Sequence, residues 1–202
     1  MYSAKVVINV KDNVQFIIDK DLISFTCSEN LKNANLDFTP GIFEQNASIE
    51  LYDRDNTFKN IVQKYTDNFF YRSEVAIYIV EDDNETLLGN YIFDKIECDG
   101  ADSVIKIDCI DYTYIFKEKY VSNSAVANRT LTQLLTMVFE MSLPSETWKF
   151  LDDATKNRCD NIVVGNSFVT RDTAYNILNA ICDCGMLNIV FKQGVFYVGR
   201  CA

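Results

Sequence analysis

Alternating apolar and polar positions dominate the first part of the chain and predict β-strands. The runs KVVINV (5–10) and VQFIID (14–19) flank the turn Lys11-Asp12-Asn13, which predicts an N-terminal hairpin. Further strands are expected at 21–30 and 47–53, and three more within 75–112, separated by acidic turns at 81–85 and 99–102. Many strands joined by short turns favour an antiparallel barrel or sandwich.

The pattern changes to a helical period after the polar, turn-rich stretch at 118–128. Single apolar stripes in 128–142 and 170–185 predict two amphipathic helices, near 130–141 and 171–184. A shorter helix is expected at 57–66. The expected end signals are a capping box of Thr130 and Gln133, an N-cap at Thr170, a helix stop at Gly185, and a hairpin over 187–199 that turns at Gln193-Gly194.

These elements predict an α+β protein with two domains. Residues 1–120 would form a mainly antiparallel β-barrel or sandwich domain. Residues 121–202 would form a smaller mixed α/β domain, with both longer helices and the C-terminal hairpin.

Composition narrows the possible functions. The 202 residues carry a net charge of −10 with no basic stripe, which argues against binding to a nucleic-acid backbone. The chain has no histidine, so it lacks the usual general base and the commonest zinc ligand. No apolar stretch approaches the length of a membrane span, and no secretory signal is recognised at the N-terminus.

One short motif suggests catalysis. Residues 49–58, IELYDRDNTF, contain the D-x-D-x-T signature of haloacid-dehalogenase-type phosphotransferases, with Asp53 as nucleophile and Asp55 as proton donor. That chemistry needs a buried parallel strand, but Glu50 gives this strand the alternation of a half-exposed antiparallel one. Hairpins follow the motif instead of βαβ units. We therefore interpret the stretch as a polar turn and keep a metal-dependent phosphohydrolase as the alternative.

The same stretch matches the start of a calcium loop at Asp53, Asp55 and Thr57. Such a loop requires glycine at its sixth position and glutamate at its twelfth, where this chain has Phe58 and Lys64. The sequence predicts no calcium site.

Cysteines and paired carboxylates give no further site. Cys182 and Cys184 would point about 200° apart on a helix, and no second cysteine pair completes a zinc site. The seven thiols are expected to be reduced, structural residues. The acidic pairs Asp82-Asp83, Asp152-Asp153 and Glu97/Asp99 fall mostly in expected turns, where solvated carboxylates are the ordinary case. No catalytic residue, metal ligand or cofactor is predicted.

The order of the elements resembles that of the baseplate hub proteins of tailed bacteriophages and related tail-like particles. The matching pieces are the turn from Asp53 to Phe58, the strands at Val75–Tyr78, Gly89–Asp94 and Val104–Asp111, the helix after Thr130, the helix Tyr175–Gly185, and the strand Phe196-Tyr197-Val198. Each motif is short, and their succession along most of the chain carries the resemblance.

The resemblance implies a tail-tube-like β-barrel domain with an α/β domain, assembled as a trimeric, possibly hexameric, ring at the distal end of the tail. Such a ring joins the tail tube or distal tail protein to a spike, fibre or lysin, and it surrounds a channel for tape-measure protein and DNA. An acidic surface would suit a channel that must not bind DNA, since like charges repel. The protein would be made in the bacterial cytoplasm, would be located in the virion, and would neither bind nucleic acid specifically nor insert into a membrane.

One departure concerns size. Hub proteins of this kind usually carry a second tube-like domain, so the resemblance implies that this chain is an N-terminal fragment or a short variant. Its eleven tyrosines leave a receptor-binding tail module as a third interpretation.

Overall fold

The computed structural model describes residues 2–10, 14–30, 40–60, 72–82, 84–98, 103–122, 128–143, 147–165 and 171–201. The chain divides into two compact units, and neither is continuous in sequence. Unit 1 consists of Met1–Glu29 and Gln45–Asp111, and unit 2 consists of Asn30–Glu44 and Tyr112–Ala202. The expected division at residue 120 was a single boundary, whereas the polypeptide passes between these units three times.

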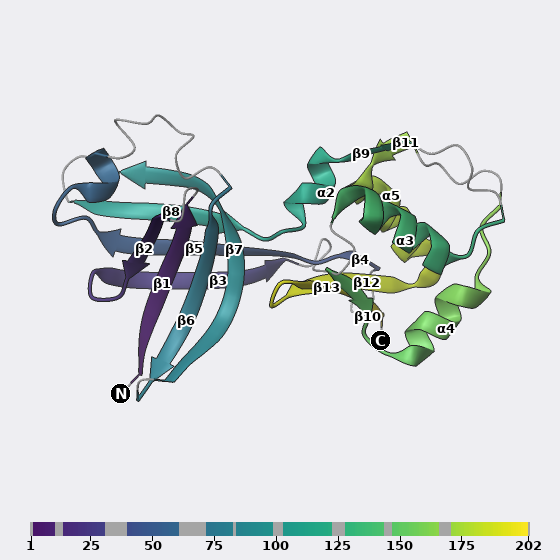
Figure 1. Ribbon diagram of the computed structural model, residues 1–202, viewed down its shortest axis with the longest axis horizontal. Coiled ribbons are helices and arrows are strands. Elements are labelled where there is room, and N and C mark those ends of the chain that lie inside the picture. The colour runs from purple at the N-terminus through teal and green to yellow at the C-terminus, as the bar shows by residue number, and fades with distance from the viewer. Residues whose placement is uncertain are drawn as a thin grey trace. The chain divides into compact units, whose positions relative to one another are not determined.

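Unit 1 is built on a seven-stranded sheet in the order β2-β1-β6-β7-β8-β5-β3 (Figure 1). The pairings of β1 with β2 and β6, of β7 with β6 and β8, and of β5 with β8 are antiparallel. The strands are β1 (Tyr2–Val10), β2 (Val14–Ile18), β3 (Leu22–Asn30), β5 (Glu44–Tyr52), β6 (Glu74–Glu81), β7 (Asn84–Cys98) and β8 (Val104–Ile110).

The expected N-terminal hairpin and the three strands within 75–112 are confirmed, as is the α+β class. Residues 57–60 are helical, in agreement with the first part of the expected helix at 57–66. The rest of that helix, the turn at 11–13, Asp83 and the turn at 99–102 lie outside the described residues.

The core of unit 1 is formed by the inner face of one curved sheet. Ile49 on β5 and Ile107 on β8 are fully buried, and they belong to the same cluster as Val6 and Ile8 on β1, which is not hydrogen-bonded to either strand. The sheet therefore folds over its own inner face. Register shifts in β7, between Phe93 and Lys95 and opposite Ile77/Tyr78, provide the bends that this curvature needs.

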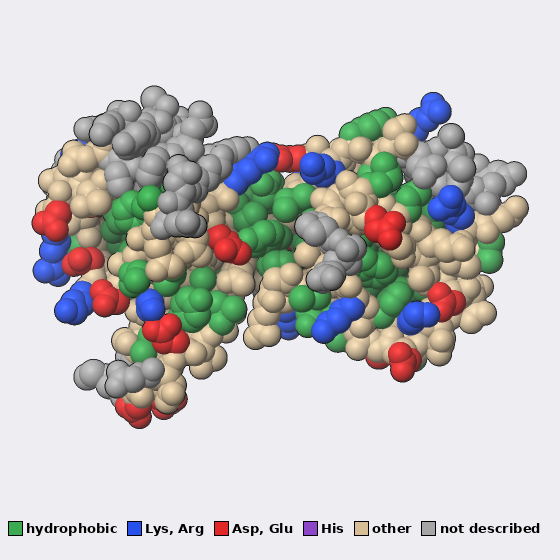
Figure 2. All heavy atoms as spheres, in the orientation of Figure 1, with side chains coloured by type: hydrophobic (Ala, Val, Ile, Leu, Met, Phe, Trp, Pro, Cys, Tyr) green, Lys and Arg blue, Asp and Glu red, His purple; other side chains and the backbone are tan. Residues whose placement is uncertain are grey.

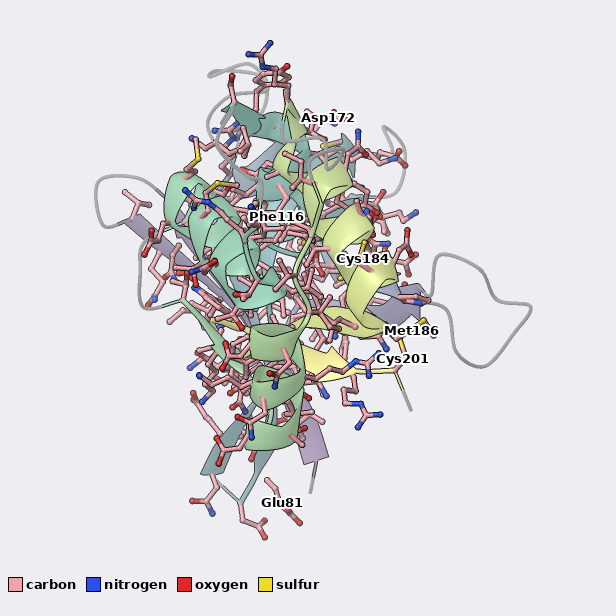
Figure 3. The ribbon with its side chains drawn as sticks, turned by 90° about the vertical axis from the view of Figure 1, so that its right-hand side faces the viewer. Glu81, Phe116, Asp172, Cys184, Met186 and Cys201 are labelled. Atoms are coloured by element: carbon pink, nitrogen blue, oxygen red, sulfur yellow. The ribbon has the colours of Figure 1, made fainter. Side chains whose placement is uncertain are left out.

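Unit 2 packs helices on one face of a four-stranded mixed sheet. The sheet order is β10-β13-β12-β4, from β10 (Trp148–Phe150), β13 (Val195–Arg200), β12 (Leu187–Lys192) and β4 (Gly41–Ile42). The helices are α2 (Tyr114–Glu118), α3 (Leu131–Ser142), α4 (Asp153–Asn161) and α5 (Ala174–Gly185), and β9 (Tyr120–Ser122) pairs with β11 (Arg171–Thr173). Figure 3 shows Phe116 of α2 in the interior, near α3 and α5. None of the described helices is long and apolar enough to cross a membrane.

The end signals of the helices were only partly predicted. The Thr130–Gln133 capping box is present at α3, and the turn at Gln193-Gly194 has positive φ at both residues, as a type I′ hairpin requires. The N-cap expected at Thr170 is wrong, because α5 begins later and Thr173 caps it by accepting a hydrogen bond from the Asn176 amide.

The helix ends at Gly185, where a stop was expected, but the C′ position expected for this glycine is wrong. Gly185 is the last helical residue, and the left-handed position belongs to Met186, with φ +52°. Gly185 is needed for a different reason: a Cβ there would lie 2.7 Å from Leu187 Cδ1 and 2.9 Å from Leu131 Cδ1. The glycine lets the helix approach its neighbours closely.

Candidate functional site: the Asp53 turn and the exposed faces

The turn containing the D-x-D-x-T motif has a structural explanation. Asp53 is buried, and its two carboxylate oxygens accept hydrogen bonds from the backbone amides of Phe58 at 3.1 Å and Lys59 at 2.9 Å. Its own amide bonds the Ser103 carbonyl, and its carbonyl accepts from Asn56. Asp53 therefore joins the end of β5 to the helical turn that starts at Thr57, as a capping carboxylate does.

The second aspartate of the motif is placed differently. Asp55 is exposed, and Arg54 between the two extends to Asp21, with Nε 2.8 Å from Oδ1. A shallow pocket of about 190 Å³ adjoins the turn, lined by residues 16–19, 21, 51–55, 57 and 58. No group of three or more acidic or cysteine side chains suited to a metal ion occurs in the part of the chain that the structure describes.

Replacing Asp53 by alanine is expected to destabilise unit 1 by about 1–2 kcal/mol, because two amides at the helix start lose a buried acceptor. Asp55→Ala is the matched control and should change the free energy of unfolding by less than about 0.5 kcal/mol, since its side chain is exposed. Guanidinium unfolding followed by circular dichroism measures both. Equal effects of the two substitutions would contradict a capping role for Asp53.

Cys182 and Cys184 lie in different surroundings, as the sequence predicted for this pair. Cys182 is fully buried in the core of unit 2, whereas Cys184, which Figure 3 labels on the same helix, is exposed. Burial raises the pKa of Cys159 to about 11 and also raises the pKa values of Cys109 and Cys182. These thiols have the features of core residues and lack those of nucleophiles.

Thiol labelling at pH 8 should separate the two groups. Cys27 and Cys184 are expected to react with a disulfide reagent such as Ellman's reagent within minutes, since both are exposed. Cys109, Cys159 and Cys182 should react only after unfolding, because burial denies access and holds their pKa values above the working pH, so that little thiolate forms. Mass spectrometry of the labelled peptides reads the outcome, and rapid labelling of Cys182 in the native protein would contradict it.

The paired carboxylates also have structural partners. Asp152 is the N-cap of α4, and the hydrogen bond that the Thr155 amide donates holds the pKa of its carboxyl below the ordinary value. Asp153 is the first residue of that helix. The hydrogen bond from Lys95 likewise lowers the pKa of Glu97. Asp83 and Asp99 lie outside the described residues.

Unit 1 carries a network of paired charges on the outer face of β5, β8 and β7. Lys95 lies 2.8 Å from Glu97 and 3.1 Å from Asp108, which also accepts a hydrogen bond from Ser48 at 2.9 Å. Burial opposes ionisation of Asp108, but these hydrogen bonds outweigh it and lower the pKa. Lys106 stands opposite Glu50 on one side and Glu97 on the other. The face is polar, and its lysines have carboxylates as neighbours.

The two ends of the seven-stranded sheet present unpaired strand edges. Within the described residues, no strand pairs with the outer edge of β2 or of β3. Apolar side chains are exposed on both: Val14 (42 %) and Ile17 (55 %) on β2, and Ile23 (42 %) on β3. Exposed strand edges with apolar side chains are templates for pairing with another chain. Both strands have the alternation of ordinary sheet strands, so their residue pattern does not mark them as edges.

Two of the comparisons with known proteins find nothing: no protein-family model matches the chain, and no curated protein matches it. Solved structures do match. The prophage tail protein gp18 from Listeria monocytogenes superimposes with a TM-score of 0.60 at 12 % identity, over 98 % of this chain and 50 % of that chain. A tail protein from Neisseria meningitidis gives 0.60 at 10 % identity, over 98 % and 50 %. The 43 kDa tail protein of prophage MuSo2 from Shewanella oneidensis gives 0.59 at 11 %, over 99 % and 54 %.

The chain therefore has the fold of these phage tail proteins, and the match includes nearly all of its residues. It spans about half the length of each of the three.

Proposed function

We propose that this protein is a non-enzymatic structural component of a bacteriophage tail or tail-like particle, located in the virion at the distal end of the tail. The observation that carries the proposal is the superposition of 98–99 % of the chain on three phage tail proteins. In this role it is a baseplate hub protein that joins the tail tube or distal tail protein to a spike, fibre or lysin, and surrounds the channel for the tape-measure protein.

The unpaired edges of unit 1 support assembly into a ring. The strands β2 and β3 form opposite ends of the sheet and both expose apolar side chains. Pairing of β2 in one copy with β3 in the next would join two unlike surfaces, and repeating such a heterologous contact closes a ring when the rotation permits. We propose a trimer, with a hexamer as the alternative.

The rival enzymatic function has less support. A phosphohydrolase would need Asp53 as a nucleophile, but both of its oxygens accept backbone hydrogen bonds within unit 1. The native protein and Asp53→Asn are both expected to hydrolyse phosphate esters no faster than the buffer alone does. Hydrolysis by the native protein that disappears in Asp53→Asn would favour the enzyme.

Incorporation into particles tests the assembly role. Ile17→Lys places a charge on the β2 edge and should reduce incorporation of the chain into particles at least tenfold. A charged side chain at a strand edge opposes pairing with another strand. Leu88→Lys is the matched control, since Leu88 is an exposed aliphatic residue (47 %) of the same unit on β7, which is next to neither β2 nor β3 in the sheet. Quantitative immunoblotting of purified particles made with each variant gives the readout. Normal incorporation of Ile17→Lys, or equal loss with Leu88→Lys, would contradict edge pairing.

A further inference from the structure

The net negative charge of the chain belongs entirely to unit 1. Of the 29 acidic and 19 basic residues, unit 1 contains 19 acidic and 9 basic, a net charge of −10, and unit 2 contains 10 of each, a net charge of zero. Such an asymmetry between two parts of one chain is a signal for electrostatic pairing with a partner of the opposite sign.

Unit 2 offers a basic surface on its sheet. The strands β10, β12 and β13 contain Lys149, Lys192 and Arg200 and no acidic residue. Lys149 and Lys192 are exposed, and Lys149 Nζ lies 4.8 Å from the centre of the Tyr197 ring. These three strands therefore carry a net charge of +3 within a unit whose net charge is zero.

The two lysines lie on the face of the sheet that the helices do not cover. Side chains on one face, including Ile189, Phe196 and Val198, are buried in the core with α3 and α5. The alternate residues point the other way, because successive residues of a strand face opposite sides. They include Phe43, Lys149, Val190, Lys192, Val195 and Tyr197, none of which belongs to that core cluster.

The strand register gathers these residues into one patch, which we call the basic sheet face. Tyr197 pairs with Lys149 on one side and with Val190 on the other, and Val195 pairs with Lys192. Phe43 follows β4 and donates its amide to the Ile189 carbonyl, beside Val190. The partly exposed aromatic and aliphatic side chains provide apolar surface that a partner can bury. The lysines provide positive charge that attracts an acidic partner.

We propose that the basic sheet face of unit 2 is a contact surface for the acidic unit 1 of a second copy of this chain. The surfaces are unlike, so the contact is heterologous and can repeat from copy to copy. Acidic side chains of unit 1 that reach solvent include Glu81 and Asp82 at the tip of the β6–β7 hairpin, where Figure 2 shows red side chains together. This contact adds a second contact surface to the proposed ring. It rests on the proposed function only in requiring that several copies lie next to one another.

Sedimentation equilibrium tests this contact directly. At about 20 mM salt the mass of the native protein is expected to rise with concentration, and at about 0.5 M salt it should fall toward that of the monomer, because salt screens the attraction. Lys149→Glu/Lys192→Glu should weaken association at least tenfold. The matched control Lys119→Glu/Lys156→Glu makes the same charge change at exposed lysines elsewhere in unit 2 and should associate like the native protein.

A carbodiimide cross-linker identifies the partner surface, since it joins a lysine to a carboxylate in contact. In a mixture of ¹⁵N-labelled and unlabelled protein, Lys149 or Lys192 should link to a unit 1 carboxylate in peptides of mixed isotope. A monomer at all salt concentrations, equal loss in the control, or links within single copies only would overturn the contact. None of these results would contradict the proposed location in the tail. Absence of the chain from particles would contradict that location, but it would not contradict a measured self-association.

Discussion

Ile42→Ala is expected to destabilise unit 2 by about 2–4 kcal/mol, although residue 42 lies 70 positions before Tyr112, where the rest of that unit begins. Ile42 is only 2 % exposed and belongs to the core cluster of unit 2. Its strand β4 pairs in parallel with β12, and its amide bonds Asn179 Oδ1 at 3.3 Å. Truncation would leave a cavity that the neighbouring strand β12 and helix α5 cannot fill.

The measurement can be confined to unit 2, because Trp148 is the only tryptophan and stacks on Phe139 with ring centres 4.7 Å apart. Its fluorescence during guanidinium unfolding reports the stability of this unit. Val163→Ala is the control, since Val163 is 57 % exposed in the same unit and should change stability by less than about 0.5 kcal/mol. An equally small effect of Ile42→Ala would mean that β4 is not an integral strand of unit 2.

The second large effect is expected at Gly185, where alanine should destabilise unit 2 by about 1–3 kcal/mol. In an ordinary helix the same change is favourable by about 0.5–1 kcal/mol, so the sign is diagnostic. The added Cβ would lie within 2.7 Å of Leu187 and 2.9 Å of Leu131, both fully buried. Repacking of these side chains costs more than the helix gains.

The neighbouring residue provides a contrast of opposite sign. Met186 has φ +52° and is 44 % exposed, so Met186→Gly should stabilise unit 2 by up to about 1 kcal/mol by removing left-handed strain. Trp148 fluorescence again gives both values. Stabilisation by Gly185→Ala would contradict the close packing of Gly185 against its neighbours, and a clear loss with Met186→Gly would contradict the left-handed strain at Met186.

Local patterns predicted the elements that depend on local rules. Alternation gave the strands of unit 1, the apolar stripe and Thr130 gave α3, and Gln193-Gly194 gave the last hairpin, because each signal lies within a few residues of its element. Helix α4 was missed because it has only two buried residues, Thr155 and Cys159, and therefore no apolar stripe.

Features that depend on distant segments could not be predicted. Nothing near Ile42 indicates that it pairs with β12, about 150 residues later. The role of Gly185 depends on Leu131, and the capping role of Asp53 depends on how the chain turns after β5. The exposed edges of β2 and β3 follow from the strand order, which sequence alternation does not specify.

The location of the protein in a particle tests the account most directly. Gold-labelled antibodies against the chain, viewed by electron microscopy on tailed particles from the organism that encodes it, should label the end of the tail distal to the head. A matched experiment with the tail sheath or tube as target gives the control for antibody access. Label on the capsid, or absence of the chain from purified particles by mass spectrometry, would contradict a structural role at the tail tip.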